Sequence, residues 1–223
     1  MRVLWGCHFE WKRLHSVRLN GWWTSSPFHH RLLWQGQWGL IAHPNGKHIV
    51  YPLGSLLVVM EKGKPATQRF LTGHKTEITA VAVSHSGRYI ASGQYSNIDR
   101  ESEIIVWDFN SLTLLYRWTM HKDSVMCLSF SSSDKFLASL GGDDRIVIWD
   151  IEEGQGFHGD RATIGSTGRC NAVCFSKNDD TLFVSGGLQN LRFWRIDIEN
   201  RTFKAENAKL DQTKRTITTI DID

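Results

Sequence analysis

The sequence predicts an all-β fold built from repeated four-stranded blades, and three observations point to it. A short run of β-branched and aliphatic residues ends on a tryptophan three times, at Trp107, Trp149 and Trp194. Two of these copies carry a histidine well ahead of the tryptophan, at His74 and His121. The copies recur about every 40–45 residues, which is the repeat length of a propeller blade of four strands. The repeat therefore defines the fold class before any single residue is interpreted.

The array is expected to begin at about Leu40, where short β runs alternate with turn signals. The dipeptide Asn45-Gly46 lies between the runs 40–42 and 48–51, and Asn-Gly strongly favours a tight hairpin. With the run 55–60, these segments predict a three-stranded blade at the start of the array.

Further blades are expected along the rest of the chain. Two are complete, with strands at 67–71, 78–83, 88–92 and 103–107, and at 112–118, 125–130, 135–139 and 145–149. A polar insertion at 95–102 delays the last strand of the first of these. A third blade spans about 161–196, with strands at 171–175, 181–185 and 191–196. The segments 202–204 and 216–222 are expected to begin one more. The predicted architecture is an open arc of about three full four-stranded blades plus partial blades.

Residues 1–38 differ from the repeat region 39–223 in composition. This segment holds six of the ten tryptophans and one acidic residue, Glu10, against five basic residues: Arg2, Lys12, Arg13, Arg18 and Arg31. It has neither strand alternation nor a helical stripe, so it is interpreted as an irregular N-terminal extension. A membrane-surface anchor and translated sequence foreign to the repeat domain are the two other interpretations.

The bulk composition argues against several classes of function. The formal net charge is +3 and the basic residues are scattered, so no nucleic-acid footprint is expected. The longest apolar run, near 55–60, is far shorter than the ~20 residues of a membrane helix. Four dispersed cysteines indicate reduced thiols in a cytosolic compartment rather than a disulfide framework: Cys7, Cys127, Cys170 and Cys174.

The most regular repeat contains a set of polar residues at fixed positions. His121 lies before the expected strand 125–130, and Ser139 ends the expected strand 135–139. Asp143 occupies the turn that follows, and Trp149 ends the expected strand 145–149. A buried histidine must place both ring nitrogens, and a turn carboxylate and a serine hydroxyl can serve them. This set resembles the Asp–His–Ser–Trp network of WD40 repeats. Incomplete sets are expected in the neighbouring repeats, at His74, Ser92 and Trp107 and at Ser185 and Trp194.

The same residues do not support a catalytic, cofactor or metal site. A hydrolase triad needs an exposed serine beside an oxyanion hole, whereas the WD40 pattern buries these residues. The string 154–159 reads G-x-G-x-x-G, but nothing after it can start the phosphate-binding helix, so a flexible loop between blades is expected. The pairs Asp143-Asp144 and Asp179-Asp180 are assigned to turns. Cys170 and Cys174 lack further ligands for a metal ion.

The strings between the repeat motifs resemble a particular family. They are His48-Ile49-Val50-Tyr51-Pro52-Leu53-Gly54, Gly87-Arg88-Tyr89-Ile90-Ala91-Ser92-Gly93-Gln94 and Ser139-Leu140-Gly141-Gly142-Asp143-Asp144. Over about 40–223 the chain resembles the N-terminal part of the cilia- and flagella-associated protein 52 family. The resemblance implies a non-enzymatic scaffold of motile cilia and flagella, bound to doublet microtubules at their inner junction. A generic cytosolic WD40 adaptor is the alternative.

The resemblance also sets the expected partners and location. Tubulin and other axonemal proteins are the expected partners, with no nucleic acid, membrane, small-molecule substrate or cofactor, in the cytoplasm, cytoskeleton and axoneme. Family members are longer, so the chain is expected to hold only their opening blades. Three whole blades cannot close a ring of typically 4–8, and the open ends are expected to make the isolated chain poorly soluble or oligomeric.

Overall fold

The computed structural model describes residues 39–96, 101–163, 168–210 and 216–222, and these residues form four antiparallel sheets of four strands each. Sheet 1 contains β1 (Ile41–Ala42), β2 (His48–Leu53), β3 (Leu56–Glu61) and β4 (Arg69–Leu71). Sheet 2 contains β5 (Ile78–Val83), β6 (Tyr89–Gln94), β7 (Glu101–Asp108) and β8 (Leu114–Lys122). Sheet 3 contains β9 (Val125–Phe130), β10 (Phe136–Gly141), β11 (Arg145–Asp150) and β12 (Gln155–Arg161). Sheet 4 contains β13 (Cys170–Phe175), β14 (Leu182–Gly187), β15 (Asn190–Asp197) and β16 (Thr202–Asn207). One short 3-10 helix, η2 (Pro65–Thr67), precedes β4.

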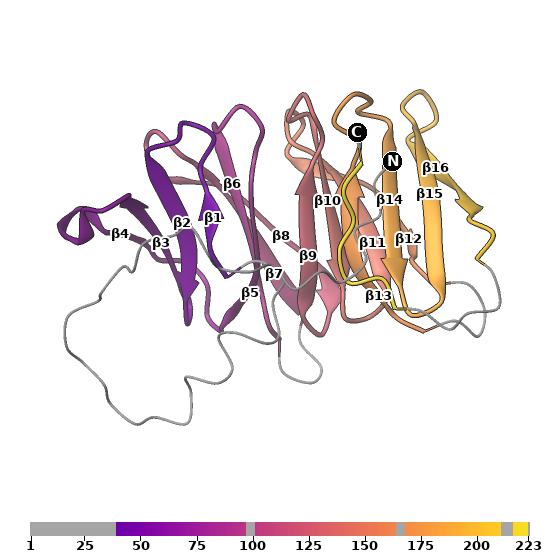
Figure 1. Cartoon of the computed structure of the whole chain (residues 1–223), viewed down its shortest axis with the longest axis horizontal. Helices are drawn as coiled ribbons and strands as arrows, with labels where there is room; N and C mark the ends of the chain where they lie inside the picture. Colours follow the sequence, from indigo (N-terminus) through magenta and orange to yellow (C-terminus); the bar gives the residue numbers. More distant parts are fainter. Residues whose placement is uncertain (1–38, 97–100, 164–167, 211–215, 223) are drawn as a thin grey trace, which may run out of the picture.

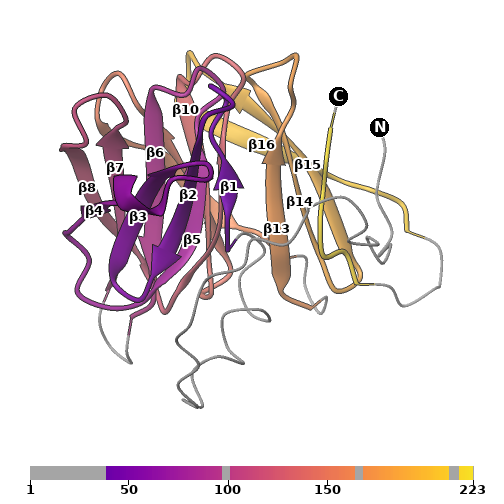
Figure 2. The same ribbon diagram turned by 60° about the vertical axis from the view of Figure 1, so that its left-hand side comes forward.

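The four sheets follow one another in chain order around a curve, with sheet 1 at one end and sheet 4 at the other (Figures 1 and 2). The first strands of neighbouring sheets lie side by side, since β5 contacts β9 and β9 contacts β13. This arrangement is an arc of propeller blades, so the all-β fold class expected from the repeat is confirmed.

The sheets are offset by one strand from the expected blades. The segments 67–71 and 112–118 were expected to open new blades, but β4 pairs with β3 and β8 pairs with β7. The segment 202–204 was likewise expected to begin a further blade, and it lies in β16, paired with β15. Each sequence repeat thus supplies the outer strand of one sheet and the three inner strands of the next. Sequence period alone cannot show this offset, because the period is the same wherever the repeat is taken to begin.

The offset, together with a strand that was not expected, raises the number of complete sheets from about three to four. The glycine-rich string 154–159 was expected to be a flexible loop, but it enters β12, which pairs along β11. Gly154 has φ +69 and makes the turn into the strand, and Gly156 packs on Trp149. Because glycine lowers strand propensity, the local composition did not predict this strand, which is held in place by its pairing with β11.

Apolar side chains fill the space between successive sheets in a regular way. One cluster joins sheets 1 and 2 around Val50, Ile90 and Trp107, and a second joins sheets 2 and 3 around Trp118 and Trp149. A third cluster joins sheets 3 and 4 and includes Phe136, Ile148, Phe183 and Trp194. A sheet between two others therefore buries both faces of its inner strands, which explains why strands such as β6 and β10 are almost continuously buried.

The segment 216–222 was expected to form a second strand of one more blade. It makes an isolated bridge, Leu188 with Thr216, and it covers the outward face of sheet 4 with Ile217, Ile220 and Ile222, each no more than 7% exposed. Its position is that of the first strand of a following blade, although no regular strand forms there. The extension 1–38 lies outside the described residues, as do positions 97–100 of the insertion.

Candidate functional site

The four polar residues expected to act together in the third sheet lie in one hydrogen-bonded chain. Nδ1 of His121 is 3.3 Å from Oδ1 of Asp143, and Nε2 of His121 is 2.7 Å from Oγ of Ser139. The indole Nε1–H of Trp149 donates to the same serine oxygen at 2.8 Å. His121 and Ser139 are fully buried. The chain links β8 of sheet 2 with β10 and β11 of sheet 3.

One arrangement of protons satisfies every member of this chain. The Nδ1–H of His121 donates to the carboxylate, and Nε2 accepts the Ser139 hydroxyl proton. The serine oxygen then accepts the indole proton of Trp149. Buried polar groups need such partners, because an unmade bond costs about 1–3 kcal/mol.

Asp143 is held as a carboxylate at the end of this chain. Burial raises its pKa, but the hydrogen bond with His121 and the backbone N–H of Lys122 outweigh burial and leave the pKa below its usual value. Space for this carboxylate depends on Gly141, because a Cβ there would collide with Asp143 Oδ1 and with the His121 ring.

In sheet 2 the same network is completed by a glutamine that sequence reasoning missed. Nε2 of His74 is 2.7 Å from Oγ of Ser92, and Trp107 Nε1–H donates to that oxygen at 2.8 Å. Oε1 of Gln94 lies 3.0 Å from His74 Nδ1 and also accepts the N–H of Lys75. Gln94 stands two residues after Ser92, the place of Gly141 in sheet 3. The amide of Gln94 therefore takes the place of the turn carboxylate, although Gln94 lies on a strand and not in the turn. Burial lowers the pKa of His74 to about 4, which keeps the ring neutral.

In sheet 4 the histidine is replaced by smaller groups. Trp194 Nε1–H donates to Ser185 Oγ at 2.9 Å, as expected from the other two sheets. The Cys170 thiol lies 3.9 Å from the same hydroxyl, and Asn190 Nδ2 donates to the Cys170 sulfur at 3.1 Å. Oδ1 of Asn190 is buried without a hydrogen-bond partner. This network is thus the least satisfied of the three.

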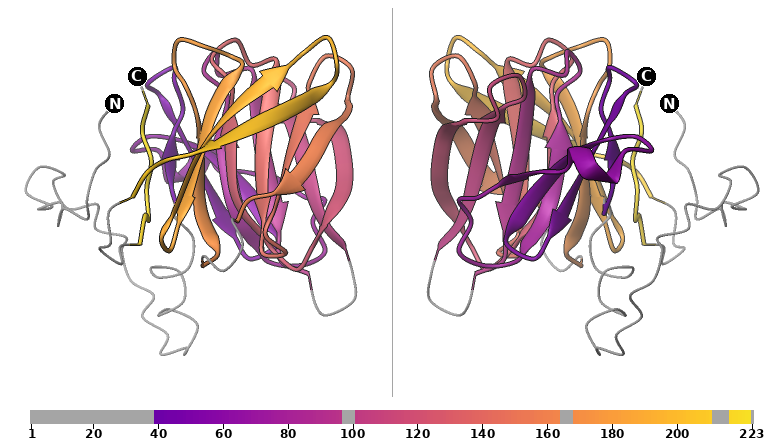
Figure 3. Two further views of the ribbon diagram at one scale, coloured as in Figure 1. Left: turned by 90° about the vertical axis from the view of Figure 1, so that its right-hand side faces the viewer. Right: turned by 90° about the vertical axis from the view of Figure 1, so that its left-hand side faces the viewer.

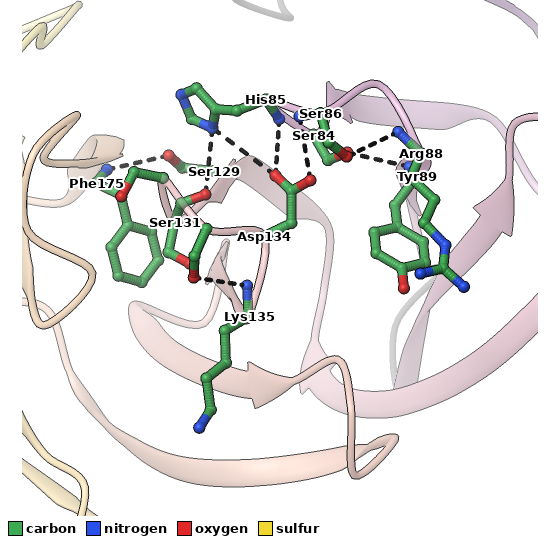
Figure 4. A network of polar contacts seen from close by, with 12 residues as sticks. Ser84, His85, Ser86, Arg88, Tyr89, Ser129, Ser131, Asp134, Lys135 and Phe175 are labelled. Carbon is green, nitrogen blue, oxygen red and sulfur yellow. Dashed lines mark hydrogen bonds and ion pairs between the residues drawn. The ribbon is translucent and has the colours of Figure 1, made fainter.

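A second repeated feature joins neighbouring sheets through turn carboxylates. Asp134, in the turn between β9 and β10, accepts the backbone N–H groups of His85 at 2.8 Å and Ser86 at 3.1 Å from the equivalent turn of sheet 2 (Figure 4). One sheet further, Asp180 accepts the N–H of Ser133 at 2.8 Å and the hydroxyl of Ser132 at 2.6 Å. Hydrogen bonds from N–H groups to a carboxylate are among the stronger ones in proteins. Sequence reasoning assigned Asp180 to local turn chemistry and did not single out Asp134.

The first junction uses an imidazole instead of a carboxylate. Nε2 of the buried His43 is 2.8 Å from the backbone oxygen of Gly87. Gly87 occupies the turn position that Asp134 holds in the next sheet. It has φ +76, and a Cβ there would meet the His43 ring at 2.6 Å. All three junctions between described sheets are therefore tied at the same turn.

The geometry of these groups is that of a structural lock. Ser139 is completely buried between His121 and Trp149, so its oxygen is not placed to attack a substrate. Burial raises the thiol pKa of Cys127 to about 11 and that of Cys170 to about 12, which disfavours the thiolate. Within the described ranges no group of three or more His, Cys, Asp or Glu residues could hold a metal ion. In the same ranges, no helix has the length and apolar character that crossing a membrane requires.

Sequence comparison defines the class to which this architecture belongs. The family model described as "WD domain, G-beta repeat" matches residues 65–108 and 112–150. Both matched segments begin near an outer strand and end at the Trp-Asp of the following sheet, at Asp108 and Asp150. The chain therefore contains WD40 repeats, and its sheets are arranged as propeller blades.

Among WD40 proteins, the chain is similar to cilia- and flagella-associated protein 52 from several organisms. It is 38% identical to the Chlamydomonas reinhardtii protein over 187 residues, which covers 83% of this chain and 30% of that protein. It is 35% identical to the Homo sapiens protein over 187 residues, with the same two coverages. The resemblance seen in the strings between the motifs is therefore confirmed. The chain spans about 30% of the length of these relatives.

Solved structures show the same fold at lower sequence identity. A structure titled "Structure of U3-55K" matches with a TM-score of 0.59 and 21% identity, covering 74% of this chain and 50% of that chain. The structure titled "Crystal structure of RRP9 WD40 repeats" matches equally well, covering 74% of this chain and 49% of that chain. At this identity the likeness concerns the fold alone.

Proposed function

We propose that this protein is a non-enzymatic scaffold of motile cilia and flagella that binds axonemal proteins, tubulin among them, at the doublet microtubule. The observation that carries the proposal is the similarity to proteins named cilia- and flagella-associated protein 52, at 35–38% identity over 80–83% of the chain. The chain also carries strings that the WD40 pattern does not require, such as Tyr51-Pro52-Leu53-Gly54, and these resemble the same family.

The physical character of the blades supports a scaffold. Sheets 2, 3 and 4 are each locked by a buried Ser–Trp bond, and each junction between the described sheets is tied at a turn. A rigid frame of this kind can present surface loops to a protein partner at little cost in conformational entropy. The buried serines and cysteines have the environment of structural groups.

The test is fractionation of axonemes from ciliated cells that express the tagged protein from its own locus. The protein is expected to remain with the doublet microtubules after detergent and salt extraction, and crosslinking mass spectrometry is expected to identify tubulin peptides. A protein that is wholly soluble after extraction would overturn the proposal. Crosslinks confined to cytosolic signalling or ubiquitin-ligase components would favour the generic adaptor.

A further inference from the structure

Sheet 2 holds a buried glutamate between two cations at the end where β7 begins. Oε1 of Glu103 accepts a hydrogen bond from Nζ of Lys75 at 3.0 Å, and its Oε2 accepts one from Nη1 of Arg117. Glu103 is 8% exposed. Burial raises its pKa, but the two cations outweigh burial and hold the pKa below its usual value. Sheet 2 therefore supplies an anion for its own cations at this place.

The equivalent place in sheet 3 carries arginines instead. Arg145 precedes Trp149 by four residues on β11, as Glu103 precedes Trp107 by four residues on β7. Arg161 lies directly opposite Arg145 in the pairing of β11 with β12, so their Cβ atoms are about 5 Å apart. Like charges placed directly opposite each other destabilise a sheet. Sheet 3 therefore has an unfavourable pair of charges where sheet 2 has a neutralised one.

A lysine starts from the same backbone position in both sheets. Lys75 and Lys122 each follow the histidine of their network, and the N–H group of each donates to the acceptor oxygen of that network. In sheet 2 the lysine reaches Glu103, whereas the residue at that position in sheet 3 is Arg145. The register of β7 and β8 also places Glu101 opposite Lys122. Lys122 thus adds a third positive charge to the arginine pair, tempered by one glutamate.

The carboxylates closest along the chain are already engaged. Asp143 accepts from the network histidine and from two backbone N–H groups, and Asp144 accepts from the N–H and the hydroxyl of one threonine. Asp160 accepts the N–H of Arg161 and lies on the opposite face of β12, because it is the neighbouring residue in the strand. Within the described residues, the guanidinium groups of Arg145 and Arg161 have neither a hydrogen bond nor an ion pair, and both residues are exposed.

A glycine leaves room beside the two arginines. Gly159 pairs with Val147 on the face that Arg145 and Arg161 share, which is the face turned toward sheet 2. A Cβ at Gly159 would meet Val147 and a backbone oxygen of β11 within 4 Å, but no described atom of sheet 2. The residue at this place in sheet 2 is Arg117, whose side chain binds the glutamate. In sheet 3 a side chain from another molecule can therefore approach the arginines over Gly159.

We propose that Arg145 and Arg161 form a binding site for the carboxylates of an acidic segment of a partner protein, with Lys122 adding to the attraction. The occupant follows from the precedent in sheet 2, where cations at the equivalent positions bind a glutamate. Arginine also suits this task, because its planar guanidinium group matches a carboxylate with two parallel hydrogen bonds.

The position of the site within the array is internal. Sheets 2 and 3 lie next to each other in the magenta and orange parts of Figure 3, and each packs against a further described sheet on its other side. The site therefore does not depend on what lies beyond sheets 1 and 4. It does not rest on the proposed ciliary role either, because binding of an acidic peptide is measured on the chain alone.

The experiment is fluorescence anisotropy of a fluorescein-labelled oligoglutamate peptide titrated with the full chain at two salt concentrations. Saturable binding that weakens as sodium chloride is raised is expected, because salt screens exposed charges. An oligoglutamine peptide of the same length is expected not to bind. Residues 1–38 also hold five basic residues, so the loss caused by substitutions in sheet 3, rather than binding as such, is the readout.

Two substitutions test the arginine pair, and one serves as a control. Arg145→Glu rebuilds the charge pattern of sheet 2 and is expected to raise the dissociation constant at least roughly tenfold. Arg161→Gln removes one guanidinium group and is expected to raise it at least roughly threefold. Arg195→Gln is the matched control, since Arg195 is an exposed arginine on sheet 4 that already pairs with Asp179, and it is expected to leave binding unchanged.

Urea unfolding of each variant separates loss of binding from loss of fold. The unfolding midpoint of Arg145→Glu is expected to equal or exceed that of the unchanged chain, because a like-charge pair becomes an opposite-charge pair. Binding that is insensitive to both Arg145→Glu and Arg161→Gln would overturn the proposal, as would an equal loss in Arg195→Gln. A phosphoserine peptide of the same length that binds more tightly, with the same dependence on both arginines, would replace the carboxylate partner by a phosphorylated one and also contradict the proposal.

Discussion

Oε1 of Gln94 lies 3.0 Å from Nδ1 of His74, where sheet 3 instead places a carboxylate against the equivalent histidine. A neutral amide and a charged carboxylate thus hold two histidines of one protein in the same tautomer. The amide comes from an inner strand and the carboxylate from the following turn. The network is defined by the position of an acceptor oxygen rather than by the residue that supplies it.

The serine hydroxyl at the centre of each network should contribute to stability in proportion to the partners it serves. Ser139→Ala leaves His121 Nε2 and Trp149 Nε1–H unpaired, so a loss of about 2–4 kcal/mol is expected. Ser185→Ala leaves chiefly Trp194 unpaired, and about 1–2 kcal/mol is expected. Urea unfolding followed by tryptophan fluorescence measures both. Ser55→Ala, in the turn before β3, is the control, with less than about 0.5 kcal/mol expected. Equal losses for Ser139→Ala and Ser185→Ala would contradict this ranking.

The exchange of Gln94 for a turn carboxylate can be tested by moving it to sheet 3. Gly141→Gln alone is expected to destabilise the protein by more than about 2 kcal/mol, because its Cβ collides with Asp143 and the His121 ring. Adding Asp143→Ala removes one colliding group and leaves the new amide free to accept from His121. The double variant should therefore be more stable than Gly141→Gln. A double variant no more stable than that single one would show that the two arrangements are not interchangeable. Gly156→Ala is the control, since its nearest neighbour is Trp149 at 3.4 Å.

The turn carboxylates should contribute to the association of neighbouring sheets. Asp134→Ala removes the acceptor for the N–H groups of His85 and Ser86, and about 2–3 kcal/mol is expected to be lost. Asp180→Ala should behave similarly at the next junction. Glu153→Ala, which removes an exposed ion pair with Arg201 and an exposed hydrogen bond from Gln155, is expected to have no measurable effect. Hydrogen exchange should show faster opening on both sides of the altered junction, and an effect confined to the mutated turn would contradict a role between sheets.

His74 should make folding sensitive to mild acid. Burial lowers its pKa from 6.5 to about 4, so between these values the unfolded chain binds a proton that the folded chain does not. Stability from this group is complete above pH 6.5 and falls as the pH drops toward 4, by at most about 3 kcal/mol. Urea unfolding at a series of pH values measures the slope. His74→Gln should flatten it within this window, and an unchanged slope would mean that another group is responsible.

The sequence predicted most of this molecule for an identifiable physical reason. The Ser–Trp bond recurs because the two residues occupy the same register positions on adjacent strands of each sheet, so Ser92, Ser139 and Ser185 could be found from the repeat. Gln94 could not, because it replaces a residue that the pattern expects in the turn. Asp134 acts on a turn 49 residues earlier in the chain, and only tertiary structure shows that contact. An aspartate in the same turn of sheets 3 and 4 was the signal that would have indicated it.

The strand β12 is a case in which the local composition predicted the wrong secondary structure. Its glycines and its G-x-G-x-x-G spacing predict a loop, yet it pairs with β11 along its length, with one register shift, as an outer strand. Local propensity is weak where a neighbouring strand offers a full set of backbone hydrogen bonds.

The one-strand offset between repeat and sheet has a consequence for how the molecule comes apart and how such molecules grow. Every repeat supplies the outer strand of the sheet before it. Unfolding of one repeat therefore removes a strand from the neighbouring sheet, so local unfolding should spread along the arc. The same overlap makes the repeat a safe unit of gene duplication. A newly inserted repeat adds the outer strand to the preceding sheet, and the following repeat adds the outer strand to the new sheet. The array can therefore lengthen without leaving an unpaired strand in its interior.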